Sequence, residues 1–74
     1  MSSKKHRQKK IGYKNNIFTG TLRGGKVSVR VQRTACGQNL LAGVFDVDTQ
    51  TWQNENRSAP LPTPVKREIE TAFT

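Results

Sequence analysis

The sequence predicts an α+β domain, in which an antiparallel sheet of three or four strands carries one C-terminal helix on one face. Three observations support this fold class. Gly24-Gly25 separates two stretches of alternating apolar and polar residues, residues 40–47 alternate in the same way, and residues 64–73 carry apolar residues at helical spacing. Period-two alternation is typical of half-buried strands, and spacings of three and four residues are typical of an amphipathic helix.

The hairpin predicted over residues 17–33 determines which side chains share a face. A two-residue loop at Gly24-Gly25 pairs Arg23 with Lys26 and Phe18 with Val31, because side chains alternate across a strand. One face is then apolar, with Phe18, Leu22, Val27, Val29 and Val31. The other face is cationic and rich in hydroxyls, with Ile17, Thr19, Thr21, Arg23, Lys26, Ser28, Arg30 and Gln32.

Residues 40–47 are predicted to form the third strand. The alternation places Leu41, Gly43, Phe45 and Val47 on one face. We expect the Phe45 face to join the core, since an aromatic ring buries the most area. Asp46 and Asp48 would then lie on the cationic side of the sheet, where a cross-strand ion pair with Lys26 or Arg30 is expected.

Two short segments have two interpretations each. Residues 51–54, which include Trp52, form either a fourth strand or a strap across the core. Residues 11–14 begin the first strand or cover the edge of the sheet. If both segments were paired strands, the sheet would have the strands needed for a small barrel.

The C-terminal helix is predicted over residues 64–73, after a proline-containing linker at 54–62. Thr63 followed by Pro64 is typical of an N-cap and the first helical position. Val65, Ile69, Ala72 and Phe73 form one apolar stripe. We expect this stripe to pack on the apolar face of the sheet; the alternative is packing on a second copy, which would give a homodimer through the helix.

The charge of the chain is unevenly distributed. The 74 residues carry a formal net charge of +8, and residues 1–34 hold ten Lys or Arg and no acidic residue. Residues 1–10 have no apolar side chain after Met1, so we predict a disordered basic arm before a single domain at 11–74. This asymmetry indicates a polyanionic partner for the first half of the chain.

Several classes of protein are disfavoured by the composition. Cys36 is the single cysteine and His6 the single histidine, so the sequence predicts no catalytic residues, no metal site and no cofactor. A lone cysteine also indicates a reducing compartment. No stretch approaches the roughly 20 apolar residues of a membrane span. We therefore expect no membrane partner and a cytoplasmic location, on the nucleoid if the source is bacterial.

Non-enzymatic nucleic-acid binding is the function that the sequence favours, with DNA preferred over RNA. Lysine and arginine neutralise phosphates, and short hydroxyls donate to phosphate oxygens. Tyr13 is the candidate for stacking on bases. The predicted contact residues are Lys4, Lys5, Arg7, Lys9, Lys10, Tyr13, Lys14, Arg23, Lys26 and Arg30. The alternative is a small regulator or inhibitor that docks on a larger protein through an exposed sheet face or edge.

Overall fold

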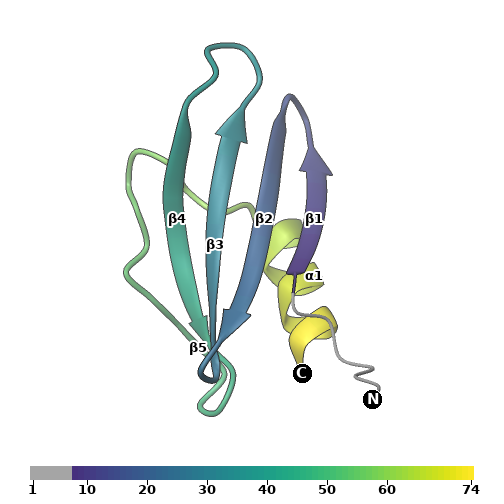
Figure 1. Cartoon of the computed structure of the whole chain (residues 1–74), viewed down its shortest axis with the longest axis vertical. Coiled ribbons are helices and arrows are strands. Elements are labelled where there is room, and N and C mark those ends of the chain that lie inside the picture. The colour runs from purple at the N-terminus through teal and green to yellow at the C-terminus, as the bar shows by residue number, and fades with distance from the viewer. Residues whose placement is uncertain (1–7) are drawn as a thin grey trace.

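The hairpin around Gly24-Gly25 forms the centre of the sheet. The computed structural model describes residues 8–74, in which β2 (Asn16–Arg23) and β3 (Lys26–Arg33) are antiparallel neighbours (Figure 1). Arg23 lies opposite Lys26 and Phe18 opposite Val31, as predicted. Gly24 and Gly25 have φ values of 56° and 78°, a left-handed conformation that the two-residue hairpin loop requires and that glycine adopts without strain.

Three further strands extend this hairpin on both sides. β1 (Gln8–Tyr13) pairs with β2, β4 (Asn39–Asp46) pairs with β3, and β5 (Thr51–Gln53) pairs with β4. The sheet therefore has five antiparallel strands in the order β1-β2-β3-β4-β5, and the expectation of three or four was low. Both short segments are paired, but β1 and β5 remain the two edges, so the sheet is open and not a barrel.

Part of the predicted disordered arm belongs to the sheet. Residues 8–10 lie in β1, where Lys9 pairs with Gly20 and Lys10 with Thr19. The prediction of disorder was wrong for residues 8–10, because Ile11, only 4% exposed, anchors the strand while the backbone of its basic neighbours pairs with β2. The rest of the predicted arm, residues 1–7, lies outside the described residues.

A β-bulge changes the faces predicted for the third strand. The register between β3 and β4 shifts between Val29 and Arg30, so that Val29 lies opposite Gly43 but Arg30 lies opposite Leu41. Phe45 and Gly43 face the core as expected. Past the bulge, however, Leu40 turns towards the core and Leu41 is 38% exposed. The prediction that Leu41 shares the Phe45 face was wrong, because one extra residue in a strand reverses every later side chain.

The bulge is held by the segment that follows β5. The backbone N–H of Asn56 donates to the carbonyl of Ala42 at 2.9 Å, and its side-chain amide donates to the carbonyl of Leu41 at 3.0 Å. Asn56 thus satisfies two backbone acceptors of β4 beyond the end of the short strand β5. Buried backbone groups need such partners, so the segment after β5 supplies hydrogen bonds to β4 that a longer edge strand would otherwise make.

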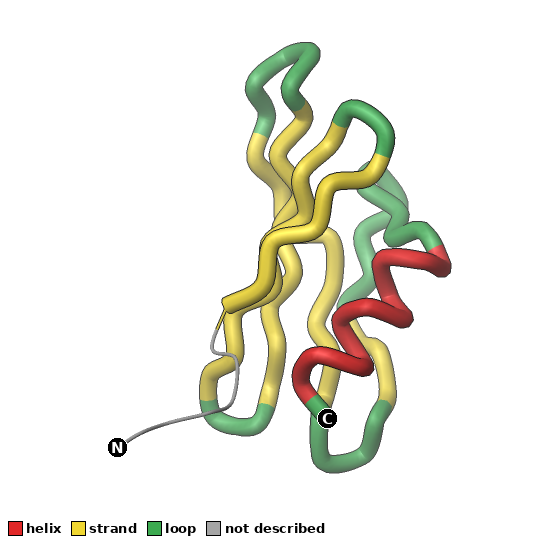
Figure 2. The backbone as a smooth tube through the Cα atoms, turned by 90° about the vertical axis from the view of Figure 1, so that its right-hand side faces the viewer, coloured by secondary structure: helices red, strands yellow, loops and turns green. Residues whose placement is uncertain are grey.

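The helix α1 (Thr63–Phe73) lies against one face of the sheet, as Figure 2 shows. It begins one residue earlier than predicted, and its N-cap is Pro62, which makes no side-chain capping bond. Thr63 is therefore not the cap; the backbone N–H of Lys66 instead donates to the Pro62 carbonyl at 3.0 Å. Val65, Ile69 and Phe73 are buried. A homodimer through this helix stays a prediction, and it would have to use another of the helix's faces.

The helix packs on the sheet over a glycine. A Cβ atom placed on Gly20 would lie 2.8 Å from Cδ1 of Ile69, 3.1 Å from Cγ1 of Val27 and 3.3 Å from Cε2 of Phe73. Ile69 and Val27 are fully buried, so these neighbours have little room to move. A side chain at Gly20 would therefore collide with the buried side chains of α1 and β3.

Trp52 connects the helix to the opposite edge of the sheet. Its ring packs against Phe45, with 4.9 Å between the ring centroids, and its indole N–H donates to the carboxylate of Glu70 at 2.9 Å. Lys66 pairs with Glu55 at 2.8 Å and lies over the Trp52 ring. Trp52 is half-buried, and an aromatic ring whose polar group is satisfied is a strong anchor, so β5 holds α1 from the side away from β1.

Replacing Gly20 with valine is expected to destabilise the protein by about 2 kcal/mol or more, because overpacking a filled core costs roughly 1–3 kcal/mol. The free energy of unfolding would be measured by denaturant titration. Gly12→Val is the matched control, since a Cβ on Gly12 meets nothing within 4 Å and the change is expected to cost little. Equal stabilities of the two variants would contradict the close packing of α1 at Gly20.

Candidate nucleic-acid interface

The face of the sheet that α1 leaves uncovered, here called the open face, carries its side chains in four cross-strand rows. The pairing of the strands defines the rows directly. From the β1–β2 turn towards the Gly24-Gly25 loop they are Gly12–Ile17–Gln32–Asn39, Lys10–Thr19–Arg30–Leu41, Gln8–Thr21–Ser28–Val44–Gln53 and Arg23–Lys26–Asp46–Thr51.

Four of the predicted contact residues meet on this face. Lys10, Arg23, Lys26 and Arg30 are all exposed, and they come from three adjacent strands. Thr19, Thr21 and Ser28 lie half-buried between them. The open face therefore combines long cationic side chains with short hydroxyls, the combination that makes phosphate contacts.

One of these cations is already paired. The ammonium of Lys26 lies 3.1 Å from the carboxylate of Asp46, so the predicted cross-strand ion pair forms with Lys26. Asp46 also accepts hydrogen bonds from the backbone N–H groups of Asp48 and Thr49. The hydrogen bond from Lys26 and those from the backbone hold the pKa of Asp46 below its ordinary value. Asp46 consequently stays ionised and shields Lys26.

Arg30 is held in place on the open face through its Nε, which leaves its terminal guanidinium nitrogens available for a ligand. Its Nε–H donates to the side-chain oxygen of Asn39 at 3.1 Å. That bond fixes the direction of the guanidinium across β4. Leu41 lies opposite Arg30 and Ile17 lies in the next row, and these two apolar side chains are 38% and 36% exposed. The open face is thus a cationic surface with two exposed apolar side chains.

The remaining predicted contact residues lie elsewhere. Lys9 and Tyr13 are on the face that α1 covers, opposite Gly20 and Asn16 of β2. Lys14 lies in the β1–β2 turn with a φ of 55°. Lys4, Lys5 and Arg7 fall outside the described residues. The alternation of β1 separates Lys9 from Lys10, and only the pairing of β1 with β2 decides which of them reaches the open face.

No aromatic side chain reaches the open face. Tyr13, Phe18, Phe45, Trp52 and Phe73 all belong to or pack against the core beneath the helix, and these are all the aromatic residues of the chain. Tyr13 therefore cannot stack on a base that lies over the cationic rows. The open face can contact phosphates and base edges through polar groups, but it lacks an aromatic stacking platform.

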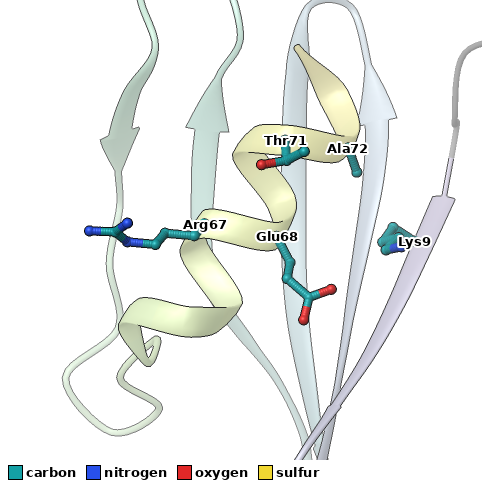
Figure 3. A pocket seen from close by; sticks show the side chains of 5 residues that line it. All are labelled: Lys9, Arg67, Glu68, Thr71 and Ala72. Atoms are coloured by element: carbon teal, nitrogen blue, oxygen red, sulfur yellow. The ribbon is translucent and has the colours of Figure 1, made fainter.

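Two of the hollows in the described part of the chain lie on the helix side of the sheet. The first, about 420 Å³, is lined by Lys9 of β1 and by Arg67, Glu68, Thr71 and Ala72 of α1 (Figure 3). The second, about 510 Å³, lies near the β1–β2 turn and includes Tyr13, Lys14 and Arg33. Arg33 was not among the predicted residues, although its place in the alternation of β3 puts it on the same face as the valines.

Within residues 8–74, no three His, Cys, Asp or Glu side chains lie close enough to hold a metal ion. In the same range, no helix is long and apolar enough to cross a lipid bilayer.

Comparisons of the chain with protein-family models, with curated proteins and with solved structures give no match. The class to which the geometry assigns the protein is a small α+β domain with one helix-covered face and one cationic open face. Any functional conclusion therefore depends on the chemistry of these surfaces.

Replacing Lys26 with glutamine is expected to raise the pKa of Asp46 towards its ordinary value of 3.8, because the hydrogen bond and charge of Lys26 are the largest cause of the lowered pKa. Carboxyl chemical shifts measured by NMR during a pH titration would give the value. Arg30→Gln is the control and should leave it unchanged.

The sign of the pH dependence follows from the same pair. A carboxyl with a lowered folded-state pKa stabilises the fold above its ordinary pKa, and that stabilisation is lost as the pH falls through the folded-state value. An Asp46 pKa that is the same with and without Lys26 would contradict the assigned cause.

Proposed function

We propose that this protein is a non-enzymatic nucleic-acid-binding protein whose open face contacts the phosphate backbone. One observation carries the proposal: Lys10, Arg23, Lys26 and Arg30 project from the same uncovered sheet face, among threonine and serine hydroxyls. The net charge of +8 supports it, because a strongly basic small domain attracts polyanions at long range.

The strength of the contact follows from the number of free cations. Asp46 offsets Lys26, so Lys10, Arg23 and Arg30 supply most of the phosphate contacts of the open face. Three neutralised phosphates correspond to a slope of roughly −3 in log K against log salt concentration. Cations of residues 1–7 would make the slope steeper.

A double-stranded partner suits the open face better than a single strand. Single strands without a preferred sequence are bound largely by stacking their bases on aromatic rings, and all the aromatic side chains lie on the other side of the sheet. Duplex DNA offers phosphates at high density without exposing base faces. We therefore propose DNA, with any base reading done by Arg23, Lys26 or Arg30.

The width of the sheet favours contact across the backbone and not inside a groove. Five strands spaced about 4.8 Å apart span roughly 19 Å, whereas the major groove is about 12 Å wide. The β2–β3 hairpin has neighbours on both sides, so it cannot enter the groove as an isolated ribbon. The hydroxyl-bearing middle strands would instead face phosphates on either side of a groove.

The alternative remains a protein-interaction module. Ile17 and Leu41 are exposed on the open face, and β1 is an edge strand whose outer side is open to a further strand. Lys9 and Lys10 lie on this edge, and lysine on an edge strand disfavours non-specific strand pairing. If the protein bound neither DNA nor RNA at about 50 mM salt, where phosphate contacts are strong, the regulator hypothesis would replace the present proposal.

The double variant Lys10→Gln/Arg30→Gln is expected to weaken duplex DNA binding and to lower the magnitude of the salt slope by roughly 2, one unit for each lost phosphate contact. Fluorescence anisotropy with a labelled duplex at several salt concentrations would measure both quantities. A single strand of the same length should bind more weakly than the duplex.

Lys9→Gln/Arg67→Gln is the matched control, because it removes one lysine and one arginine from the helix side. Its salt slope should stay close to that of the unmodified protein. Equal losses in the two double variants would mean that net charge alone attracts DNA, and the open face would no longer be the site.

Asp46→Asn is expected to strengthen duplex binding at low salt and to steepen the salt slope by about one unit, because it releases Lys26 from its ion pair and leaves a further cation for a phosphate. The measurement is the same anisotropy titration. Glu68→Gln changes the net charge equally but lies on the exposed side of α1, and its effect should be smaller. A weaker complex with Asp46→Asn would contradict the placement of phosphate beside Lys26.

A further inference from the structure

The second hollow on the helix side is a feature that the open face does not explain. It lies at the end of the sheet near the β1–β2 turn, where the segment before α1 crosses back beneath β2 and β3 (Figure 1). Its volume of about 510 Å³ is within the range of sites for small molecules, roughly 300–1,000 Å³. Segments that are far apart in the sequence form it, so it exists only in the folded protein.

The floor and walls of this hollow are apolar and partly aromatic. Phe18, Val31 and Ala59 line its floor and are each 2% exposed. Half-buried Tyr13 and the rings of Pro60 and Pro62 line it at the sides. Flat apolar rings are the surfaces on which another ring stacks well.

Two cations lie at this hollow. The ammonium of Lys14 is 5.6 Å from the centroid of the Tyr13 ring. The guanidinium of Arg33 donates a hydrogen bond to the carbonyl of Ser58, which holds it in position. No Asp or Glu lines the hollow, so its charge of about +2 is not offset locally and favours an anionic ligand.

The apolar floor favours a ligand that contains a ring, and the two cations favour a ligand that also carries an anionic group. We propose that this hollow, formed by Tyr13, Lys14, Phe18, Arg33 and Pro60, binds a nucleoside monophosphate, either free or at the phosphorylated end of a strand. The base packs on the proline rings and the apolar floor, and the phosphate is bound by Arg33 and by Lys14, whose ammonium lies over the Tyr13 ring. The site is independent of the open face, because it lies on the opposite side of the sheet and shares none of its cations.

Cys36 provides a direct reporter of occupancy. It is the single cysteine of the chain, it is exposed, and it lines the hollow. A ligand in the hollow would shield its thiol from reagents in solution. The rate at which a thiol reagent modifies Cys36 can therefore be followed with and without ligand in the full-length protein.

Adenosine 5′-monophosphate is expected to slow the modification of Cys36, by about tenfold at ten times its dissociation constant. Adenosine alone and inorganic phosphate alone should protect much less at the same concentration. A duplex with a 5′-phosphorylated overhang, compared with the same duplex lacking the phosphate, would distinguish a strand end from a free nucleotide as the source. Amide NMR shifts in the same titration should concentrate at residues 13–16 and 33–36.

Lys14→Asn is the variant that tests the phosphate contact. Lys14 has a φ of 55°, and asparagine accepts this left-handed conformation well, so the turn should be kept. Losing a charged partner of the phosphate should weaken nucleotide binding roughly tenfold. Arg67→Gln removes the same charge from α1, outside this hollow, and should leave the affinity unchanged.

The results separate this site from the open face. Absent protection together with absent amide shifts at the hollow would overturn the proposal, as would equal affinities of Lys14→Asn and Arg67→Gln for the nucleotide. Equal protection by inorganic phosphate would also overturn it, since the base would then contribute nothing. Blunt duplex binding through Lys10 and Arg30 would be unaffected by any of these results.

Discussion

The close packing of α1 on Gly20 is the constraint on which the rest of the structure depends. A side chain at this position would meet Ile69, Val27 and Phe73 within 3.3 Å, so the helix can reach β2 only over a bare backbone. That contact buries the apolar stripe of a helix too short to be stable alone. It also covers one face of the sheet and leaves the open face exposed to solvent.

The separation of the two faces has a chemical consequence. The side that receives the helix collects every aromatic ring of the chain, because rings bury the most area. The open side carries Lys10, Arg23, Lys26 and Arg30 among threonine and serine hydroxyls. A surface of this kind favours phosphates over base faces. Rings and cations meet on the helix side, at Trp52 beneath Lys66 and in the hollow that includes Tyr13 and Lys14.

The bulge in β4 shows how one residue changes the surface of a small sheet. Without it, Leu41 would lie on the core face and Leu40 on the open face. With it, Leu41 lies beside Arg30, and the freed carbonyls of Leu41 and Ala42 accept hydrogen bonds from Asn56. The segment after β5 therefore supports the bulge that brings Leu41 to the open face, although this segment contributes no side chain to the four rows.

The sequence by itself determined the central hairpin, its register and the location of the helix, because local alternation and the Gly24-Gly25 loop specify them. It also determined that Arg23, Lys26 and Arg30 share a face and that Asp46 lies within reach of Lys26. Only the tertiary structure decided that residues 8–10 form an edge strand, that Leu41 faces solvent and that Lys9 and Tyr13 lie behind the sheet. These features depend on pairing between distant strands and on contacts with the segment before α1, and no local pattern of residues encodes such long-range contacts.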